Sequence, residues 1–189
     1  MTTRHFDLIA FDWDGTLVDS TAIITRSIQA AVRDVGGKVP TEQQASYVIG
    51  LGLRKALAHA APDVPKELYP HLGLRYKHHY EQHQDDISLF EGVLPMLKGL
   101  KKREHWLSVA TGKSRNGLDI ALRAVALQGL FGASRTADET AGKPNPLMLL
   151  ELMAEFGVQA SRSLMVGDTT HDLQMALIAG CPSVAVCYG

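Results

Sequence analysis

The chain has 189 residues, of which 46% are hydrophobic and 21% are charged, a composition typical of a globular protein with a buried core. Its 19 basic and 20 acidic residues leave a net charge of −1, which gives no electrostatic footprint for nucleic acid or an anionic membrane. No stretch approaches the roughly 20 apolar residues of a transmembrane helix, no apolar signal region stands at the start, and two cysteines are too few for a disulfide scaffold. These features predict a cytoplasmic protein.

Short apolar runs that end in polar loops recur along the chain. The first covers residues 6–11, and its length and its glycine-containing exit favour a buried strand over a helix. Similar runs follow at residues 106–110, 163–166 and 183–186, with a weaker one at 132–136. Helical patterns lie at residues 94–101, 118–125, 147–156 and 173–179. Strands that alternate with helices predict an α/β fold, in which a doubly wound parallel sheet carries helices on both faces.

Residues 17–87 interrupt this alternation. A long helical stretch at residues 22–35 stops at Gly36-Gly37, and further helical pieces follow it, separated by proline and glycine. No strand pattern is found there. We therefore predict an all-helical domain at residues 17–87, inserted into an α/β core that is formed by residues 1–16 and 88–189.

Polar loops follow the predicted strands, and in open parallel sheets ligands bind beyond the carboxyl ends of the strands. Asp12-Trp13-Asp14-Gly15-Thr16 follows the first strand, and Thr111-Gly112-Lys113-Ser114 follows the second. Gly167-Asp168-Thr169-Thr170-His171-Asp172 follows the fourth. Gly142-Lys143-Pro144 precedes a predicted helix, which Pro144 is expected to begin directly after Lys143. The four loops predict one site at one edge of the sheet.

The charges in these loops indicate the chemistry. Clustered carboxylates repel one another and are costly unless a cation lies among them. Oxygen ligands select a hard ion, and Mg²⁺ typically takes one or two carboxylates, waters and a substrate phosphate. Gly15 supplies a bend at which Asp14 can offer its backbone carbonyl to the metal and its side chain to the substrate. Thr111, Lys143 and the free N–H groups at helix starts predict an anionic partner. These groups are what phosphoryl transfer through an aspartyl-phosphate requires.

The four loops resemble the four sequence motifs of the haloacid dehalogenase superfamily. Residues 12–16 match its first motif, Thr111 the second, Lys143 the third, and residues 167–172 the fourth. The helical insertion is similar to the cap of the subgroup that contains phosphoglycolate phosphatases and β-phosphoglucomutases. Residues 50–53, 109–113 and 166–172 look closest to the phosphoglycolate phosphatase-like members. True dehalogenases lack the second aspartate of the first motif, so Asp14 favours phosphate chemistry.

The resemblance implies a Mg²⁺-dependent phosphatase that acts on a small phosphorylated metabolite. Asp12 would attack phosphorus and form the aspartyl-phosphate, while Asp14 would protonate the leaving alcohol and then activate water. The metal ligands would be Asp12, the backbone carbonyl of Asp14, and Asp168. The residues that hold the phosphoryl oxygens would be Thr111, Gly112 and Lys143.

Four further residues lie near these motifs in the sequence. Asp172 is expected to orient Lys143 or a metal-bound water, and His171 is expected to lie on the solvated surface. Arg54 and Lys55 stand at a helix start in the insertion, where they either meet the distal end of the substrate or stay solvated.

Other functions remain open on the same motifs. A phosphosugar mutase of the β-phosphoglucomutase type would return the phosphoryl group to a second hydroxyl of the substrate. A pyrophosphatase or nucleotidase would differ only in what the cap admits. A phospho-accepting signalling domain, which is not an enzyme, would need a durable aspartyl-phosphate and no acid/base at position 14, so Asp14 counts against it.

The run at residues 183–186 is expected to form the last strand at a sheet edge. Nothing follows Gly189 in this sequence to cover that strand. An open edge exposes unpaired N–H and C=O groups, and an uncovered face exposes apolar side chains. This predicts either a longer chain or self-association at this edge.

Overall fold

The centre of the fold is a five-stranded parallel sheet, as seen in a computed structural model that describes residues 5–189. The strands are β1 (Leu8–Phe11), β2 (Trp106–Thr111), β3 (Ala133–Thr136), β4 (Ser163–Gly167) and β5 (Ser183–Ala185). Their order across the sheet is β3-β2-β1-β4-β5, and every neighbouring pair is parallel. The five apolar runs are therefore strands, and the prediction of a doubly wound α/β fold is confirmed.

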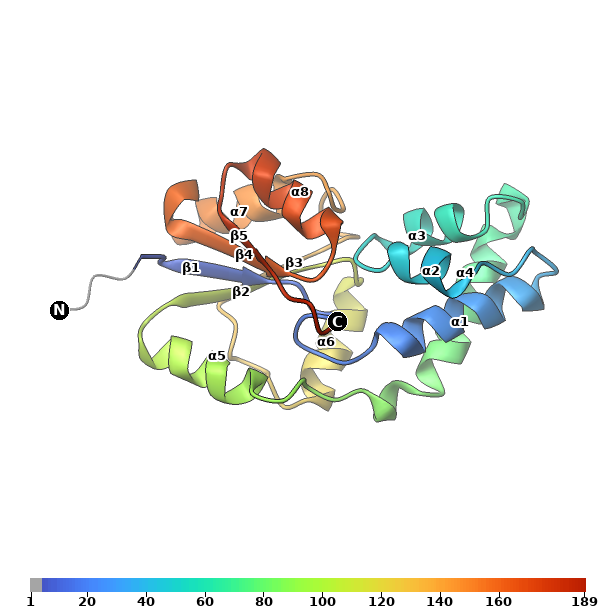
Figure 1. Cartoon of the computed structure of the whole chain (residues 1–189), viewed down its shortest axis with the longest axis horizontal. Coiled ribbons are helices and arrows are strands. Elements are labelled where there is room, and N and C mark those ends of the chain that lie inside the picture. The colour runs from blue at the N-terminus through green and yellow to red at the C-terminus, as the bar shows by residue number, and fades with distance from the viewer. Residues whose placement is uncertain (1–4) are drawn as a thin grey trace.

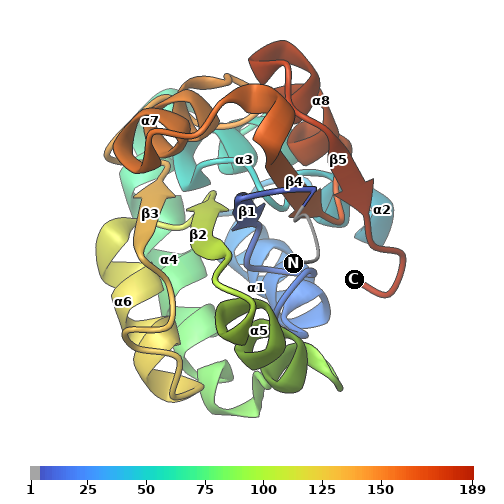
Figure 2. The same cartoon turned by 90° about the vertical axis from the view of Figure 1, so that its left-hand side faces the viewer.

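Helices cover both faces of this sheet, as Figure 2 shows. One face carries α5 (Val93–Lys102) and α6 (Arg115–Ala124), and the other carries α7 (Leu147–Phe156) and α8 (Thr170–Ala179). Because side chains alternate along a strand, Leu8 and Ala10 of β1 pack in the cluster with α7 and α8, while Ile9 and Phe11 pack with α5. A strand that is buried on both faces has to be apolar throughout, which explains the continuous apolar run.

Four helices lie beyond the sheet at the right of Figure 1. They are α1 (Thr21–Asp34), α2 (Glu42–Tyr47), α3 (Leu53–Ala60) and α4 (Tyr69–Glu81), with one-turn 3₁₀ helices at Lys66–Leu68 and Gln84–Asp86; a third such turn, Ala160–Arg162, precedes β4. Residues 21–86, all of which the structure describes, contain no strand. Their apolar side chains form a separate cluster that includes Ile28, Val32 and Leu72. The insertion is helical as predicted, and its bounds at residues 17 and 87 stay a prediction.

The loop between α2 and α3 reaches back to the sheet. A Cβ added to Gly112 would lie 2.5 Å from the carbonyl oxygen of Gly50 and 2.6 Å from that of Leu51, so the two backbones touch at a residue without a side chain. The ammonium of Lys55 lies 3.5 Å from the carbonyl oxygen of Lys143. The helical insertion therefore covers the carboxyl ends of the central strands.

His171 is part of the same contact. Its ring is buried, its Nε2 lies 2.9 Å from the carbonyl oxygen of Tyr47 at the end of α2, and the two rings meet edge to face. The prediction of a solvated surface position is wrong, because α2 packs over the first turn of α8. Only the tertiary packing brings these two segments together.

Strand β5 is at the sheet edge, as predicted, and all three of its residues are exposed. After it the backbone N–H of Val186 donates to Gly167, and the hydroxyl of Tyr188 donates to the carbonyl oxygen of Thr16. The described end of the chain therefore lies beside the loop that follows β1 (Figure 1). Within residues 5–189, none of the helices has the length and apolarity to cross a bilayer.

Candidate active site

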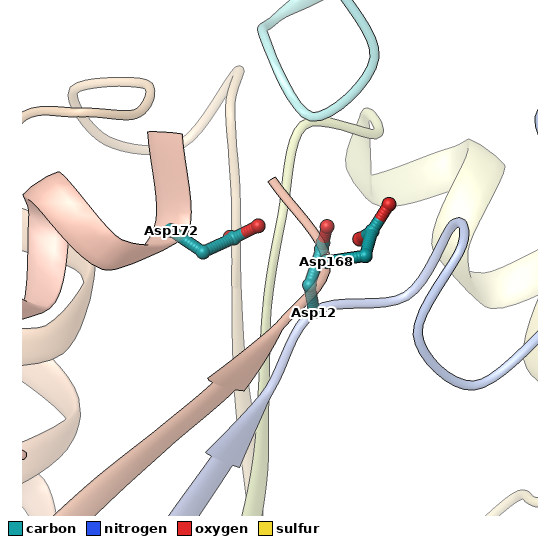
Figure 3. Close-up of side chains that lie close together, drawn as sticks. All are labelled: Asp12, Asp168 and Asp172. Carbon is teal, nitrogen blue, oxygen red and sulfur yellow. The ribbon is translucent and has the colours of Figure 1, made fainter. Parts of the chain in front are cut away.

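Three carboxylates meet at the carboxyl ends of β1 and β4. Asp12 directly follows β1, Asp168 directly follows β4, and Asp172 lies in the first turn of α8 (Figure 3). The register pairs Phe11 with Val166, so the neighbouring strands end side by side. One carboxylate oxygen from each aspartate lies within 4.8 Å of the others. The carboxylates that the sequence places after the strand ends therefore come together at one edge of the sheet, and their role as a ligand site stays a prediction.

Lys143 supplies a buried positive charge to this cluster. Its ammonium is 2.7 Å from Oδ1 of Asp12 and 2.6 Å from Oδ1 of Asp172, and all three side chains are almost completely buried. Burial lowers the pKa of Lys143, but the charges of the two aspartates outweigh this and raise it, so the lysine stays charged. An ammonium at this position offsets the repulsion between the carboxylates.

The loop that carries Lys143 differs from the prediction at one point. Helix α7 begins at Leu147, three residues after Pro144, so the prediction that Pro144 begins the helix is wrong. Pro146 is the N-cap residue, and the side chain of Asn145 accepts a hydrogen bond from the N–H of Leu147. Since Lys143 lies in an irregular loop, its ion pairs rather than a helix hold its side chain in place.

The aspartate cluster fits a hard divalent cation. Oδ2 of Asp12 is buried and has no hydrogen-bond partner in residues 5–189. Burial raises the pKa of Asp12 well above its usual range, the charge of Asp172 adds to this, and Lys143 opposes it. Burial likewise raises the pKa of Asp168, against the effect of the Thr16 hydroxyl, which donates to it at 2.9 Å. Buried carboxylates whose charge is poorly compensated match the oxygen ligands that Mg²⁺ prefers.

The three aspartates are not equally available to a cation. Both oxygens of Asp172 already have partners, because Oδ1 faces Lys143 and Oδ2 accepts from the N–H and the hydroxyl of Thr169 in the capping box of α8. Asp168 instead approaches Gly15, whose φ is +77° and where an added Cβ would collide with the carboxylate. Gly15 therefore makes the bend expected of it and leaves room for Asp168.

Thr111 and Gly112 lie beside this cluster at the end of β2, which is paired with β1. Thr111 is buried, and its hydroxyl accepts a hydrogen bond from the N–H of Lys113 at 3.2 Å. Gly112 lies under the α2–α3 loop. The structure thus brings every residue predicted for the site to one edge of the sheet.

Asp14 faces a different direction from the other aspartates. Its Oδ1 accepts a hydrogen bond from the Ser20 hydroxyl at 2.7 Å and lies 3.1 Å from the ammonium of Lys113. It lines a cavity of about 560 Å³ between the core and the helical insertion. Arg54 and Lys55 line the same cavity. This favours contact with the distal end of the substrate over a solvated position, the two alternatives considered for them.

Several neighbours of Asp14 could not be identified from the sequence. The site includes Ser20 and Lys113, and the cavity wall also includes Tyr76 and Tyr80 of α4. Lys113 lies in one of the motif loops, and this position was the only feature of the sequence that pointed to a role in the site. Nothing in the local sequence separates the two tyrosines from the histidines around them.

A parallel sheet with a carboxylate cluster at the ends of its strands, under a helical insertion, defines a capped α/β enzyme. The chain matches the haloacid dehalogenase-like hydrolase family over residues 9–186. It is 35% identical to the phosphoglycolate phosphatase of Aliivibrio fischeri, over 96% of this chain and 84% of that protein. This chain therefore belongs to the haloacid dehalogenase-like hydrolases.

Solved structures agree with this assignment. The crystal structure of a predicted phosphoglycolate phosphatase from Haemophilus somnus superposes with a TM-score of 0.84 at 26% identity, covering 100% of this chain and 88% of that one. A β-phosphoglucomutase from Clostridium difficile shares the fold, with a TM-score of 0.85 at 17% identity over 96% of this chain and 85% of that one. The predicted family and enzyme class, a hydrolase of the phosphatase type, are confirmed.

Proposed function

We propose that this chain is a Mg²⁺-dependent phosphatase of small phosphomonoesters, with 2-phosphoglycolate as the first candidate substrate, and that it works in the cytoplasm. Residues 17–87 would form the cap, and residues 1–16 and 88–189 the core. The observation that carries the proposal is the position of Asp12, which is buried beside Lys143 with one oxygen that has no hydrogen-bond partner within residues 5–189. This oxygen lies close to Gly50, which lines the same cavity as Asp14. The relative from Aliivibrio fischeri supports the choice of substrate.

Two carboxylates divide the covalent chemistry. Asp12 attacks phosphorus in line, the bond from phosphorus to the ester oxygen breaks, and Asp14 gives its proton to the leaving oxygen. Asp14 then takes a proton from a water that attacks the aspartyl-phosphate, which releases inorganic phosphate and restores Asp12. The position of Asp14 in the cavity wall, on the side where the organic part of the ester would lie, supports this division.

The remaining residues bind and orient. The hydroxyl of Thr111, the N–H of Gly112 and the ammonium of Lys143 hold the phosphoryl oxygens, and Lys143 also offsets the repulsion between Asp12 and the incoming dianion. Mg²⁺, held by Asp12, Asp168 and the carbonyl of Asp14, supplies charge that stabilises the transferring phosphoryl group.

Phosphate release from a panel of esters tests this function. We expect release of inorganic phosphate only with Mg²⁺, and the largest kcat/KM for 2-phosphoglycolate. A sugar phosphate that changes the position of its phosphoryl group without release would indicate the mutase. Activity on nucleotides or pyrophosphate alone would indicate a nucleotidase or pyrophosphatase. A stable phospho-enzyme without turnover of any ester would indicate the signalling domain.

Asp14→Asn is expected to separate the two steps of the reaction. With an ester that has a good leaving group, the variant should still form the aspartyl-phosphate, because this step then needs little proton donation. Hydrolysis should be slow, since no base activates the water, so phospho-enzyme should accumulate. Rapid-quench labelling measures this, with Asp12→Asn as the unlabelled control. If no phospho-enzyme accumulates, Asp14 is not the acid/base.

Metal dependence is expected to rest on Asp168 more than on Asp172. Asp168→Ala removes a direct ligand and should raise the Mg²⁺ requirement steeply or eliminate activity. Asp172→Ala removes a carboxylate that pairs with Lys143 and accepts a hydrogen bond from Thr169. This should weaken Mg²⁺ affinity by about 10- to 100-fold. Activity is measured against Mg²⁺ concentration, after thermal unfolding has shown that both variants are folded. Equal effects would show that the two roles are assigned wrongly.

We also propose self-association along the edge strand β5. Val184 is 47% exposed there, and Leu177 and Ile178 of the adjacent α8 are 79% and 61% exposed. Apolar side chains next to an open strand edge favour pairing with a second copy. Light scattering should report a dimer that Val184→Lys shifts toward monomer. A thermally stable monomer of the unchanged chain would contradict this proposal.

A further inference from the structure

Lys113 is a buried cation that the reaction scheme above does not use. Its side chain is 11% exposed, although lysine is seldom buried without partners. Its ammonium lies 3.1 Å from Oδ1 of Asp14, donates to the hydroxyl oxygen of Tyr80 at 3.0 Å, and sits 4.8 Å from the centre of that ring. The carboxylate and the phenol together compensate for the loss of water around the ammonium.

These three residues come from three separate parts of the chain. Asp14 lies in the loop after β1, Lys113 in the loop after β2, and Tyr80 in helix α4 of the insertion. Tyr80 is itself held by Tyr76, one turn earlier in α4, against which its ring stacks at 6.0 Å. Burial raises the pKa of both phenols, so they stay neutral and Lys113 is the donor.

We propose that Lys113 is a positioning residue for Asp14, and that Tyr80 makes this positioning depend on how the helical insertion sits on the core. The inference rests on the proposed function, in which Asp14 is the acid/base. Ser20 and Lys113 both contact Oδ1, so they fix the rotation of the carboxylate toward the cavity.

A second role for Lys113 has to be distinguished from this one. A cation in the wall of a substrate cavity can also bind a negative group on the organic part of the substrate. The two roles differ in measurable ways. Positioning of an acid affects the rate of alcohol release in the first turnover, and affects it most for esters whose leaving group needs a proton. Binding of a negative group affects KM, and only for substrates that carry such a group.

The test compares variants on three esters in the presence of Mg²⁺. The esters are 2-phosphoglycolate, ethyl phosphate, which has no second negative group, and 4-nitrophenyl phosphate, whose leaving group needs little protonation. Lys113→Met removes the charge, Lys113→Arg retains it, and Tyr80→Phe removes only the hydroxyl. Lys98→Met is the matched control, because Lys98 is exposed on α5, away from the cavity.

We expect Lys113→Met to lower the rate of alcohol release in the first turnover by about 10²- to 10³-fold for both alkyl esters, within the range that general acid catalysis contributes. The loss of this first-turnover rate with 4-nitrophenyl phosphate should be below about 10-fold, and the ester concentration that gives half the maximal rate should stay nearly constant. Lys113→Arg should recover part of the alkyl ester activity. Tyr80→Phe should lower the same rate for both alkyl esters by roughly 10-fold, which is the effect of losing one hydrogen bond. Lys98→Met should not differ from the unchanged chain.

Three outcomes would overturn the inference. An equal loss of the first-turnover rate for all three esters would indicate a structural role, and a rise in KM for 2-phosphoglycolate alone would indicate substrate binding. Unchanged rates would show that Lys113 has no role in turnover. If Lys113→Met does not fold, the same three esters are compared with Lys113→Arg and Tyr80→Phe instead. Asp14→Asn distinguishes failure of this inference from failure of the proposed function. If its first-turnover rate of alcohol release does not depend on the leaving group, the proposed function itself fails.

Discussion

Asp12→Asn should abolish Mg²⁺-dependent phosphate release, by at least about 10⁴-fold, because the amide keeps the shape of the carboxylate but is not a nucleophile. The variant should remain folded, since the amide oxygen can still accept from Lys143, which keeps its ion pair with Asp172. Phosphate release and rapid-quench labelling measure the loss. Retention of more than a trace of Mg²⁺-dependent turnover would show that the covalent mechanism is wrong.

The same substitution should change how stability depends on pH. Burial raises the pKa of Asp12 in the folded state, so its protonated form is favoured there. The stability that this carboxyl contributes is therefore present below its unfolded pKa and is lost as the pH rises through its folded pKa. Asp12→Asn removes this titration, so the difference in free energy of unfolding between the variant and the unchanged chain should shift in the variant's favour from pH 4 to pH 8. Urea unfolding in metal-free buffer measures this, and a pH-independent difference would contradict it.

Lys143→Met is expected to have the second large effect, on both stability and activity. The substitution leaves Asp12 and Asp172 buried without their ammonium partner, and removing one partner of a buried ion pair costs roughly 3–5 kcal/mol. The loss should be larger at pH 7 than at pH 4, because burial raises the pKa of Asp12, and protonation of Asp12 at the lower pH relieves its repulsion with Asp172. Lys143→Met should also lower turnover, because the incoming phosphate dianion would meet carboxylates whose charge is no longer compensated.

Urea unfolding at pH 7 and pH 4, in metal-free buffer, gives the stability of Lys143→Met. Lys98→Met is again the control, since it removes a solvent-exposed ammonium of the same size. Added Mg²⁺ should restore part of the lost stability at pH 7, because a cation replaces some of the missing positive charge. If Lys143→Met is as stable as the unchanged chain at pH 7, the ammonium does not stabilise the cluster.

The main elements of the fold follow from local patterns in the sequence. A strand that is covered on both faces is expected to be apolar, and this holds for all of residues 8–11. The other inner strands, β2 and β4, are largely apolar but contain the buried polar residues Ser108, Thr111 and Ser163. The end of α7 at Phe156 matches the predicted helix, because its apolar run stops before the Gly157 C-cap. Asp12 and Asp168 could be predicted as site residues for a related reason, since each directly follows a strand of a parallel sheet.

Other features depend on contacts between segments that are far apart in the chain. His171 has a polar local sequence, yet α2 packs over it and buries it. Lys143 is followed by a proline that is compatible with a helix start, but its two ion pairs determine where its side chain lies. Local periodicity contains no information on either contact.

The sequence by itself determined the alternation of strands and helices, the helical insertion and the loops that carry the carboxylates, because each depends on neighbouring residues and on strand ends. Only the tertiary structure decided that Asp172 has partners for both oxygens, while Asp12 has one oxygen without a hydrogen-bond partner among the described residues. It also decided that Lys113 joins Asp14 to Tyr80. The physical reason is burial. A charge inside the protein is stable only beside its partners, and which partners surround it is determined by the packing of the helical insertion on the sheet.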